Sequence, residues 1–226
     1  MVHPHAGDAR SALLDFGGCR PGRRGPAPNR GARVAHSDSP DRPLIPPVIH
    51  RVRAREEADR IVETVDLEFS NGERRLYSRI RARGQGAVII AAMPDPETVL
   101  LVREYACGVE RYELGLPKGR IDGDEGVLAA ADRELKEEVG FGARTLTQLR
   151  SLSLAPNYMT HQAYVVLAED LYPERLPGDE PEELEVVPWK LDALDELVLR
   201  EDCSDGRSLA ALFVVREVVR ARGACA

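Results

Sequence analysis

Three acidic side chains crowd one short stretch of the chain. Glu134, Glu137 and Glu138 fall within little more than one helical turn. On a helix, which advances by about 100° per residue, they share one arc. The like charges of Glu134 and Glu138, at i and i+4, cost about 0.2–0.5 kcal/mol, and Arg133 can relieve only part of the repulsion. The cluster is either a solvated acidic face or a site for a hard divalent cation, which takes oxygen ligands.

The segment that must position these carboxylates is predicted to be a helix over residues 125–139. Its apolar residues recur at the spacing of one helix face, which is typical of a helix packed on a core. Asp124 stands where an N-cap residue belongs, and Gly140 stands where a left-handed residue would end the helix. The apolar stripe consists of Leu128, Ala131, Leu135 and Val139.

The spacing around the glutamates favours the cation site. Gly119, five further residues, Glu125, seven further residues and then RELKEEVGF make up residues 119–141. This segment resembles the Nudix box at every fixed position, so the chain is similar to the Nudix hydrolases. The resemblance implies an α/β/α sandwich with a mixed sheet, in which a loop–helix–loop segment holds Mg²⁺ or Mn²⁺ against a diphosphate.

The resemblance also implies roles within the box. Glu134 and Glu138 are expected to bind the metal directly, with Glu137 next and the carbonyl of Lys118 as a further ligand. Bridging metal ions neutralise diphosphate charge and acidify a bound water, and several carboxylates on one rigid helix suit that task. Structural or orienting roles are expected for Gly119, Glu125, Arg133 and Gly140.

Attack of water on phosphorus also needs a general base. ADP-ribose diphosphatases place a glutamate for this step in a mobile loop, and the acidic loop PGDEPEELE, residues 177–185, is its counterpart here. A mobile loop suits a group that acts only once substrate is bound. Glu180 and Glu182 are the candidates, with Glu183 third. The alternative is a solvated loop without a role and a base among the box glutamates, for which Glu137 is the catalytic candidate.

Three further residues are candidates for substrate contacts. Arg103 ends the apolar run LLV and is either a solvated strand end or a phosphate contact, since its planar guanidinium matches phosphate oxygens. Tyr112 and Tyr158 either stack on adenine or pack in the core.

The flanks of the box narrow the resemblance. LLVREYACGVERYELGLPKGRID and EDLYPERLPGDEPEEL look like the ADP compounds hydrolase subfamily, related to the ADP-ribose diphosphatases. That subfamily implies cleavage of ADP-ribose, NADH and diadenosine polyphosphates with release of AMP. It also implies a homodimer in which N-terminal strands of each subunit help to build the other's site. The alternatives are a Nudix hydrolase of another nucleotide sugar or of RNA 5′ ends, and a non-catalytic Nudix ligand sensor.

Composition excludes several other classes of protein. The 226 residues are 43% hydrophobic and 31% charged, as in a globular domain. A net charge of −7 argues against broad binding of nucleic acid, and no apolar run approaches the roughly 20 residues of a membrane span. The four cysteines show no CxxC spacing, which favours reduced thiols in the cytoplasm.

The chain is predicted to have two parts. Residues 1–47 are rich in proline, glycine and arginine and are interpreted as a disordered basic arm, an overextended start, or an arm that contacts RNA or a partner. Residues 48–226 are predicted to form the Nudix hydrolase domain. It opens with a β-hairpin over 61–82 that turns at Asn71-Gly72. Further strands are expected at 86–93, 98–105, 147–155, 162–170 and VVPW, and further helices at 192–200 and 207–221.

Overall fold

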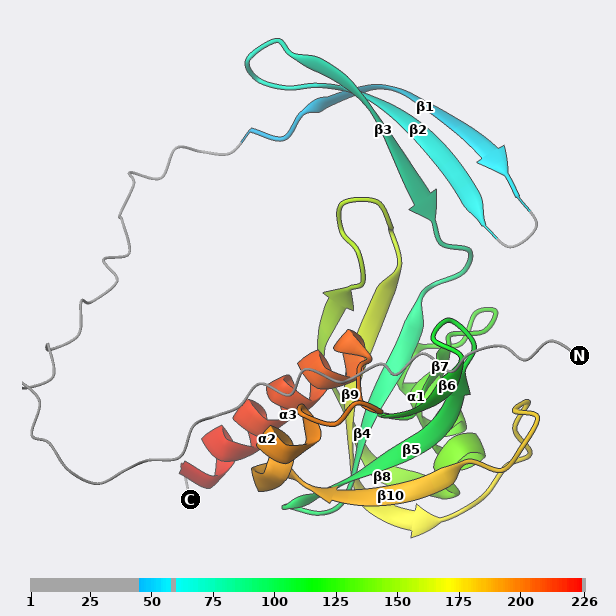
Figure 1. Cartoon of the computed structure of the whole chain (residues 1–226), viewed down its shortest axis with the longest axis vertical. Coiled ribbons are helices and arrows are strands. Elements are labelled where there is room, and N and C mark those ends of the chain that lie inside the picture. Colours follow the sequence, from blue (N-terminus) through cyan, green and yellow to red (C-terminus); the bar gives the residue numbers. More distant parts are fainter. Residues whose placement is uncertain (1–44, 58–59, 225–226) are drawn as a thin grey trace, which may run out of the picture. The chain divides into compact units, whose positions relative to one another are not determined.

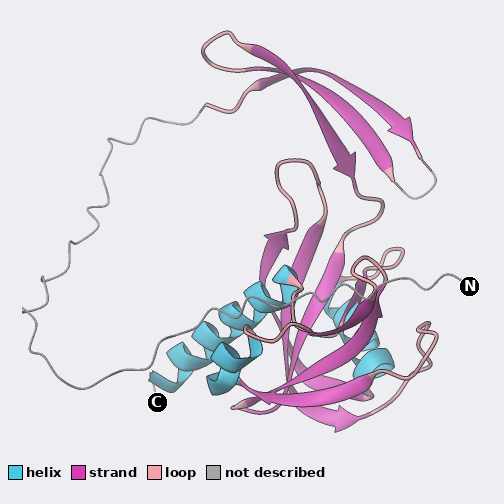
Figure 2. Ribbon diagram, in the orientation of Figure 1, coloured by secondary structure: helices cyan, strands magenta, loops and turns pink. Residues whose placement is uncertain are grey.

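The computed structural model describes residues 45–57 and 60–224. The arm predicted for residues 1–47 therefore lies, except for its last three residues, outside the described part of the chain. Within that part, no helix has both the length and the apolarity to cross a membrane. The described residues fold into two antiparallel or mixed sheets with a few helices (Figures 1 and 2).

The first sheet has three antiparallel strands in the order β1-β2-β3. Strands β2 and β3 confirm the predicted hairpin. Its turn places Gly72 at φ 82°, in the left-handed region that favours glycine, and Asn71 Oδ1 accepts the Glu73 N–H at 3.0 Å. Strand β1 was not foreseen, because every one of its residues is exposed and its sequence has no buried face. The strands are β1 (Val48–Glu56), β2 (Ile61–Glu68) and β3 (Arg74–Arg81).

The second sheet has seven strands. Five of them lie in the order β10-β5-β4-β9-β8, while β6 pairs with β5 and β7 pairs with β4. Strands β4 and β9 run parallel and the other paired strands run antiparallel, so the sheet is mixed as expected. The strands are β4 (Ala87–Asp95), β5 (Thr98–Ala106), β6 (Arg111–Gly115), β7 (Lys118–Arg120), β8 (Phe141–Ser153), β9 (Gln162–Pro173) and β10 (Glu185–Lys190).

Helices cover both faces of this sheet. Side chains on a strand alternate between its faces, and β4 supplies both cores. Val88 and Ile90 pack in the cluster that contains Leu135 of the box, whereas Ile89 packs in the cluster that contains Leu212 of the C-terminal helix. The α/β/α sandwich is therefore confirmed. The helices are α1 (Val127–Glu134), a π-helical turn (Leu135–Val139), a 3₁₀ turn (Leu191–Ala193), α2 (Leu194–Leu197) and α3 (Gly206–Ala224).

The box helix begins and continues differently from the prediction. Its N-cap is Gly126, not Asp124, because Glu125 lies in the preceding turn, where its N–H bonds the Asp122 carbonyl at 3.0 Å. After Glu134 the helix widens into a π-helical turn, a feature often found at functional sites. The predicted end is confirmed, since Gly140 adopts φ 80° and ψ 26°.

Candidate functional site

The site begins where strand β7 meets the box helix. At Gly119 an added Cβ would lie 1.9 Å from Cδ of Glu134, so any side chain there would displace that carboxylate. Beside it, the Lys118 N–H donates to Oε2 of Glu138 at 3.0 Å. The strand thus binds Glu138 through a backbone hydrogen bond and leaves room at Gly119 for the Glu134 carboxylate.

Arg133 lies at the centre of the acidic cluster. Its Nη1 donates to Glu134 at 2.8 Å and to Glu137 at 3.0 Å. Its Nη2 donates to Glu125 at 2.6 Å and to the Arg120 carbonyl at 2.9 Å. The hydrogen bond to Glu125 is the main reason that the pKa of Arg133 is raised. These contacts give Arg133 and Glu125 the orienting geometry that the box resemblance implies.

Glu134 and Glu138 are buried, with side chains that retain little exposure. Burial raises the pKa of Glu138 to about 8 against the opposing pull of Lys118, and burial likewise raises the pKa of Glu134. For both carboxylates, desolvation outweighs the opposing contacts of Arg133 and Lys118 and favours the neutral form over the anion. A divalent cation would supply compensating positive charge.

The donor set fits a hard cation. It offers carboxylate oxygens on one rigid helix, with no sulfur or imidazole among the box residues, as Mg²⁺ and Mn²⁺ prefer. In the described part of the chain, no three acidic, histidine or cysteine side chains form a ready-made ligand cluster. Arg133 donates to both Glu134 and Glu137 from Nη1, so these two carboxylates are paired with a guanidinium.

A cavity of about 420 Å³ joins the box to the acidic loop. Glu180 of the loop lines it, and its negative charge contributes to the raised pKa values of both Glu134 and Glu138. Glu182 accepts the Tyr112 hydroxyl at 2.7 Å. Glu180 lines the cavity at Glu134, whereas Glu182 lines only a neighbouring cavity, which Glu137 and Glu180 also border. The cavity is lined by Lys118, Gly119, Arg120, Asp122, Arg133, Glu134, Glu137, Pro177, Gly178, Asp179 and Glu180.

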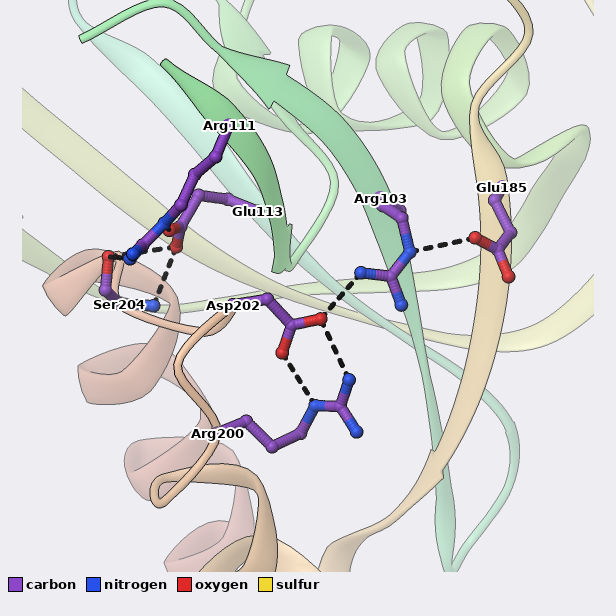
Figure 3. A network of polar contacts seen from close by, with 7 residues as sticks. All are labelled: Arg103, Arg111, Glu113, Glu185, Arg200, Asp202 and Ser204. Carbon is purple, nitrogen blue, oxygen red and sulfur yellow. Dashed lines mark hydrogen bonds and ion pairs between the residues drawn. The ribbon is translucent and has the colours of Figure 1, made fainter. Parts of the chain in front are cut away.

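The three expected substrate contacts lie outside this cavity. Arg103 donates to Glu185 at 2.9 Å and to Asp202 at 2.7 Å, within the ion-pair network of Figure 3. Tyr158 lines a different cavity, and its carbonyl accepts the Ile80 N–H at 2.7 Å. Phosphate contact by Arg103 would compete with two carboxylates that already hold it.

Arg120, which follows directly after Gly119, is not among the site residues predicted from the sequence. Its side chain is exposed and lines the box cavity. Among the residues that the structure describes, its guanidinium makes no hydrogen bond or ion pair, unlike those of Arg103 and Arg133. Its position at the start of the box could have pointed to it as a site residue. Because its side chain lines the cavity, Arg120 is a candidate to bind diphosphate oxygens.

Comparison with known families agrees with this fold and this acidic cavity. A model of the NUDIX domain matches residues 83–213, and a model of the NudE-type Nudix hydrolase N-terminal domain matches residues 47–79. The chain belongs to the Nudix hydrolase family, and the expectation of a Nudix enzyme is confirmed.

Individual relatives and one solved structure show which Nudix hydrolases the chain is similar to. The ADP compounds hydrolase NudE of Escherichia coli (strain K12) is 52% identical over 162 residues, which cover 72% of this chain and 87% of that protein. The ADP-ribose pyrophosphatase of Bacillus subtilis (strain 168) is 29% identical over 149 residues, covering 65% of this chain and 80% of that protein. A crystal structure of an ADP compounds hydrolase superposes with a TM-score of 0.73 at 49% identity, covering 80% of this chain and 97% of that chain. The resemblance to the ADP compounds hydrolases is therefore confirmed.

Proposed function

We propose that this protein hydrolyses the diphosphate linkage of ADP-containing compounds and releases AMP. The observation that carries the proposal is the cavity that Glu134 and Glu137 of the box line together with Glu180 of the acidic loop. The charge of Glu180 also acts on the buried carboxylates of Glu134 and Glu138. The 52% identity to an ADP compounds hydrolase supports the choice of substrate class. ADP-ribose, NADH and diadenosine polyphosphates are the substrates that we propose.

Glu134 and Glu138 would hold the metal, with Glu137 and the Lys118 carbonyl as further ligands. When bound, Mg²⁺ or Mn²⁺ supplies charge neutralisation for the diphosphate and acidification of water. Arg133 orients Glu134 and Glu137 from one guanidinium nitrogen. Glu180 is the preferred general base, because it is the candidate in the acidic loop that lines the box cavity; Glu182 and Glu183 are not among the residues that line it.

Substrate profiling tests the proposal. The purified chain would be assayed with ADP-ribose, NADH, diadenosine triphosphate and GDP-mannose, with Mg²⁺ or Mn²⁺ and with EDTA. We expect metal-dependent release of AMP from at least one ADP compound, at a kcat/KM above that for GDP-mannose. GDP-mannose is the sharpest competitor, since a GDP-mannose pyrophosphatase of Salmonella paratyphi B is 30% identical over 159 residues. Preference for GDP-mannose would replace the proposed substrate class, turnover of none of the four compounds but of a capped RNA added as a fifth would assign RNA 5′ ends, and metal binding without turnover would indicate a ligand sensor.

We also propose a cytoplasmic homodimer. The three-stranded sheet exposes apolar side chains, including Val52 and Tyr77 on one face, each 44% exposed. A small sheet needs a packed apolar face for stability, and a second copy of the sheet offers a matching one. Light scattering of the intact chain, and of Val52→Lys, tests this. We expect twice the chain mass for the first and a loss of association for the second; monomers for the intact chain would contradict the proposal.

A further inference from the structure

The acidic loop is held at both of its ends. At the first end, the Leu176 N–H donates to the Lys136 carbonyl in the box helix at 3.2 Å. At the second end, Leu184 is buried in the core cluster that also contains Leu135 of the box. The Glu185 side chain that follows is bound by Arg103 at 2.9 Å (Figure 3). Between these ends, the loop residues 177–183 form no strand or helix of their own.

Side-chain contacts hold the middle of the loop, where Arg175 pairs with Glu183 at 3.7 Å and Tyr112 binds Glu182. The Tyr112 hydroxyl of β6 donates to Oε1 of Glu182 at 2.7 Å, a short hydrogen bond to a carboxylate. The Tyr112 ring lies edge-on to Tyr105, with ring centroids 5.5 Å apart. Tyr112 is 47% exposed, and within the described chain the partner of its hydroxyl is the Glu182 carboxylate.

Strand β6 is a firm base for that contact. Arg111 and Glu113 flank Tyr112, and Glu113 accepts the Arg111 guanidinium at 2.6 Å. The other Glu113 oxygen accepts the Ser204 N–H at 2.7 Å, which joins β6 to the segment before α3 (Figure 3). Residues on both sides of Tyr112 are thus fixed by charged hydrogen bonds, and its hydroxyl is presented from a rigid element.

The geometry links Glu182 to Glu180. Only Pro181 separates them, and a proline ring fixes its own φ near −65°. Glu182 is exposed and bound to Tyr112, while Glu180 is half-buried in the box cavity. Holding one of these side chains therefore restricts the direction of the other.

We propose that Tyr112 is a positioning residue that holds the acidic loop through Glu182, so that Glu180 stays over the box carboxylates. This inference rests on the proposed function and adds a residue to it. It assigns different tasks to two glutamates that the sequence alone leaves equivalent. It gives the Tyr112 hydroxyl a role of its own, beside the adenine stacking that the sequence predicts for the ring.

The test compares Tyr112→Phe, Glu182→Gln and Glu182→Ala on ADP-ribose at saturating Mg²⁺. Tyr112→Phe keeps the ring and removes the donor, so we expect kcat to fall about fivefold, the value of one net hydrogen bond, with KM nearly unchanged. The kcat of Glu182→Ala should fall by the same factor. Glu182→Gln keeps an oxygen acceptor and should retain most of the wild-type kcat. Combining Tyr112→Phe with Glu182→Ala should add little, since the two changes break the same contact.

Tyr105→Phe is the matched control. Its ring belongs to the same aromatic pair and is 49% exposed, and its hydroxyl has no hydrogen-bond partner in the described chain. We expect wild-type kcat. Wild-type kcat in both Tyr112→Phe and Glu182→Ala would overturn the proposal. So would a loss of about a hundredfold in Glu182→Gln alone, since that would make Glu182 the general base.

A second readout does not depend on turnover. Amide hydrogen exchange over residues 177–183 should be faster in Tyr112→Phe than in the wild type and unchanged in Tyr105→Phe. If the wild type hydrolyses no ADP compound, the proposed function fails while the exchange result still decides the contact. Unchanged exchange in Tyr112→Phe would overturn the positioning role even in an active enzyme.

Discussion

Two buried glutamates, one in each sheet region, have opposite electrostatic surroundings. Glu63 in β2 is 6% exposed and accepts hydrogen bonds from Arg79 and Arg81, each at 2.8 Å. The Arg79 contact is the main cause that lowers its pKa. Glu138 in the box is 3% exposed, and burial raises its pKa to about 8. A buried carboxylate that is paired with arginines is stabilised as an anion by the protein itself. A buried carboxylate without such a pair needs positive charge from elsewhere, which a bound cation can supply.

The largest expected effect comes from replacing a buried box glutamate by neutral glutamine. Glu134→Gln and Glu138→Gln should each lower kcat by about a hundredfold or more, because each removes a metal ligand. Metal-free thermal stability should stay equal or rise by about 2–4 °C per kcal/mol recovered. Steady-state kinetics and calorimetry with EDTA measure both quantities. Full activity in both variants would refute the metal site.

The pH dependence of metal-free stability follows from the same shift. The folded-state pKa of Glu138 is raised from 4.5 to about 8, so the folded protein binds this proton more tightly than the unfolded chain. Stability should therefore fall as pH rises between these values. Glu138→Gln should lack this decline, and an equal decline in the variant would show that other groups cause it.

Gly119→Ala tests the backbone side of the box. The new Cβ would lie 1.9 Å from Cδ of Glu134 and must displace it. We expect metal affinity or kcat to fall about 10–100-fold, as when a residue that orients a ligand is lost. Gly126→Ala is the control at the N-cap of the same helix, where an added Cβ meets nothing within 4 Å. Equal effects in both variants would rule out the close approach as the cause.

Glu63→Gln should behave in the opposite way to Glu138→Gln. It leaves Arg79 and Arg81 without their shared anion, so we expect a loss of about 1–3 kcal/mol in unfolding free energy and unchanged metal affinity. Because the pKa of Glu63 is lowered on folding, its contribution is present above the ordinary glutamate pKa and is lost as pH falls. Denaturant unfolding with and without metal measures both properties. If Glu63→Gln instead raised the unfolding free energy, the two glutamates would not differ in the way proposed.

The sequence predicted what depends on local pattern. The apolar runs of β4 and β5, the Asn71-Gly72 turn and the end of the box helix at Gly140 follow from periodicity and glycine chemistry. Strand β1 was not predicted because it is wholly exposed, and β7 was not predicted because it has only three residues. The partner of Arg103 could not be foreseen, since Asp202 lies 99 residues away in the chain. The different surroundings of Glu180, which lines the cavity at the box, and of Glu182, which is bound by Tyr112, likewise depend on the path of the loop.

The smallest expected effect concerns the arm, residues 1–47. Its composition is typical of a segment that buries no core, and the register of the first sheet begins after it, at Val48 opposite Glu68. Deleting it should therefore change kcat/KM on ADP-ribose by less than about threefold. Deletion through Glu56 is the contrasting variant, because it removes β1 and leaves one edge of β2 unpaired. We expect that longer deletion to lower thermal stability and to promote aggregation while the shorter one does neither. A large loss of activity on removing residues 1–47 alone would assign the arm to the site or to its partner, and the boundary at Val48 would then no longer separate the catalytic domain from the rest of the chain.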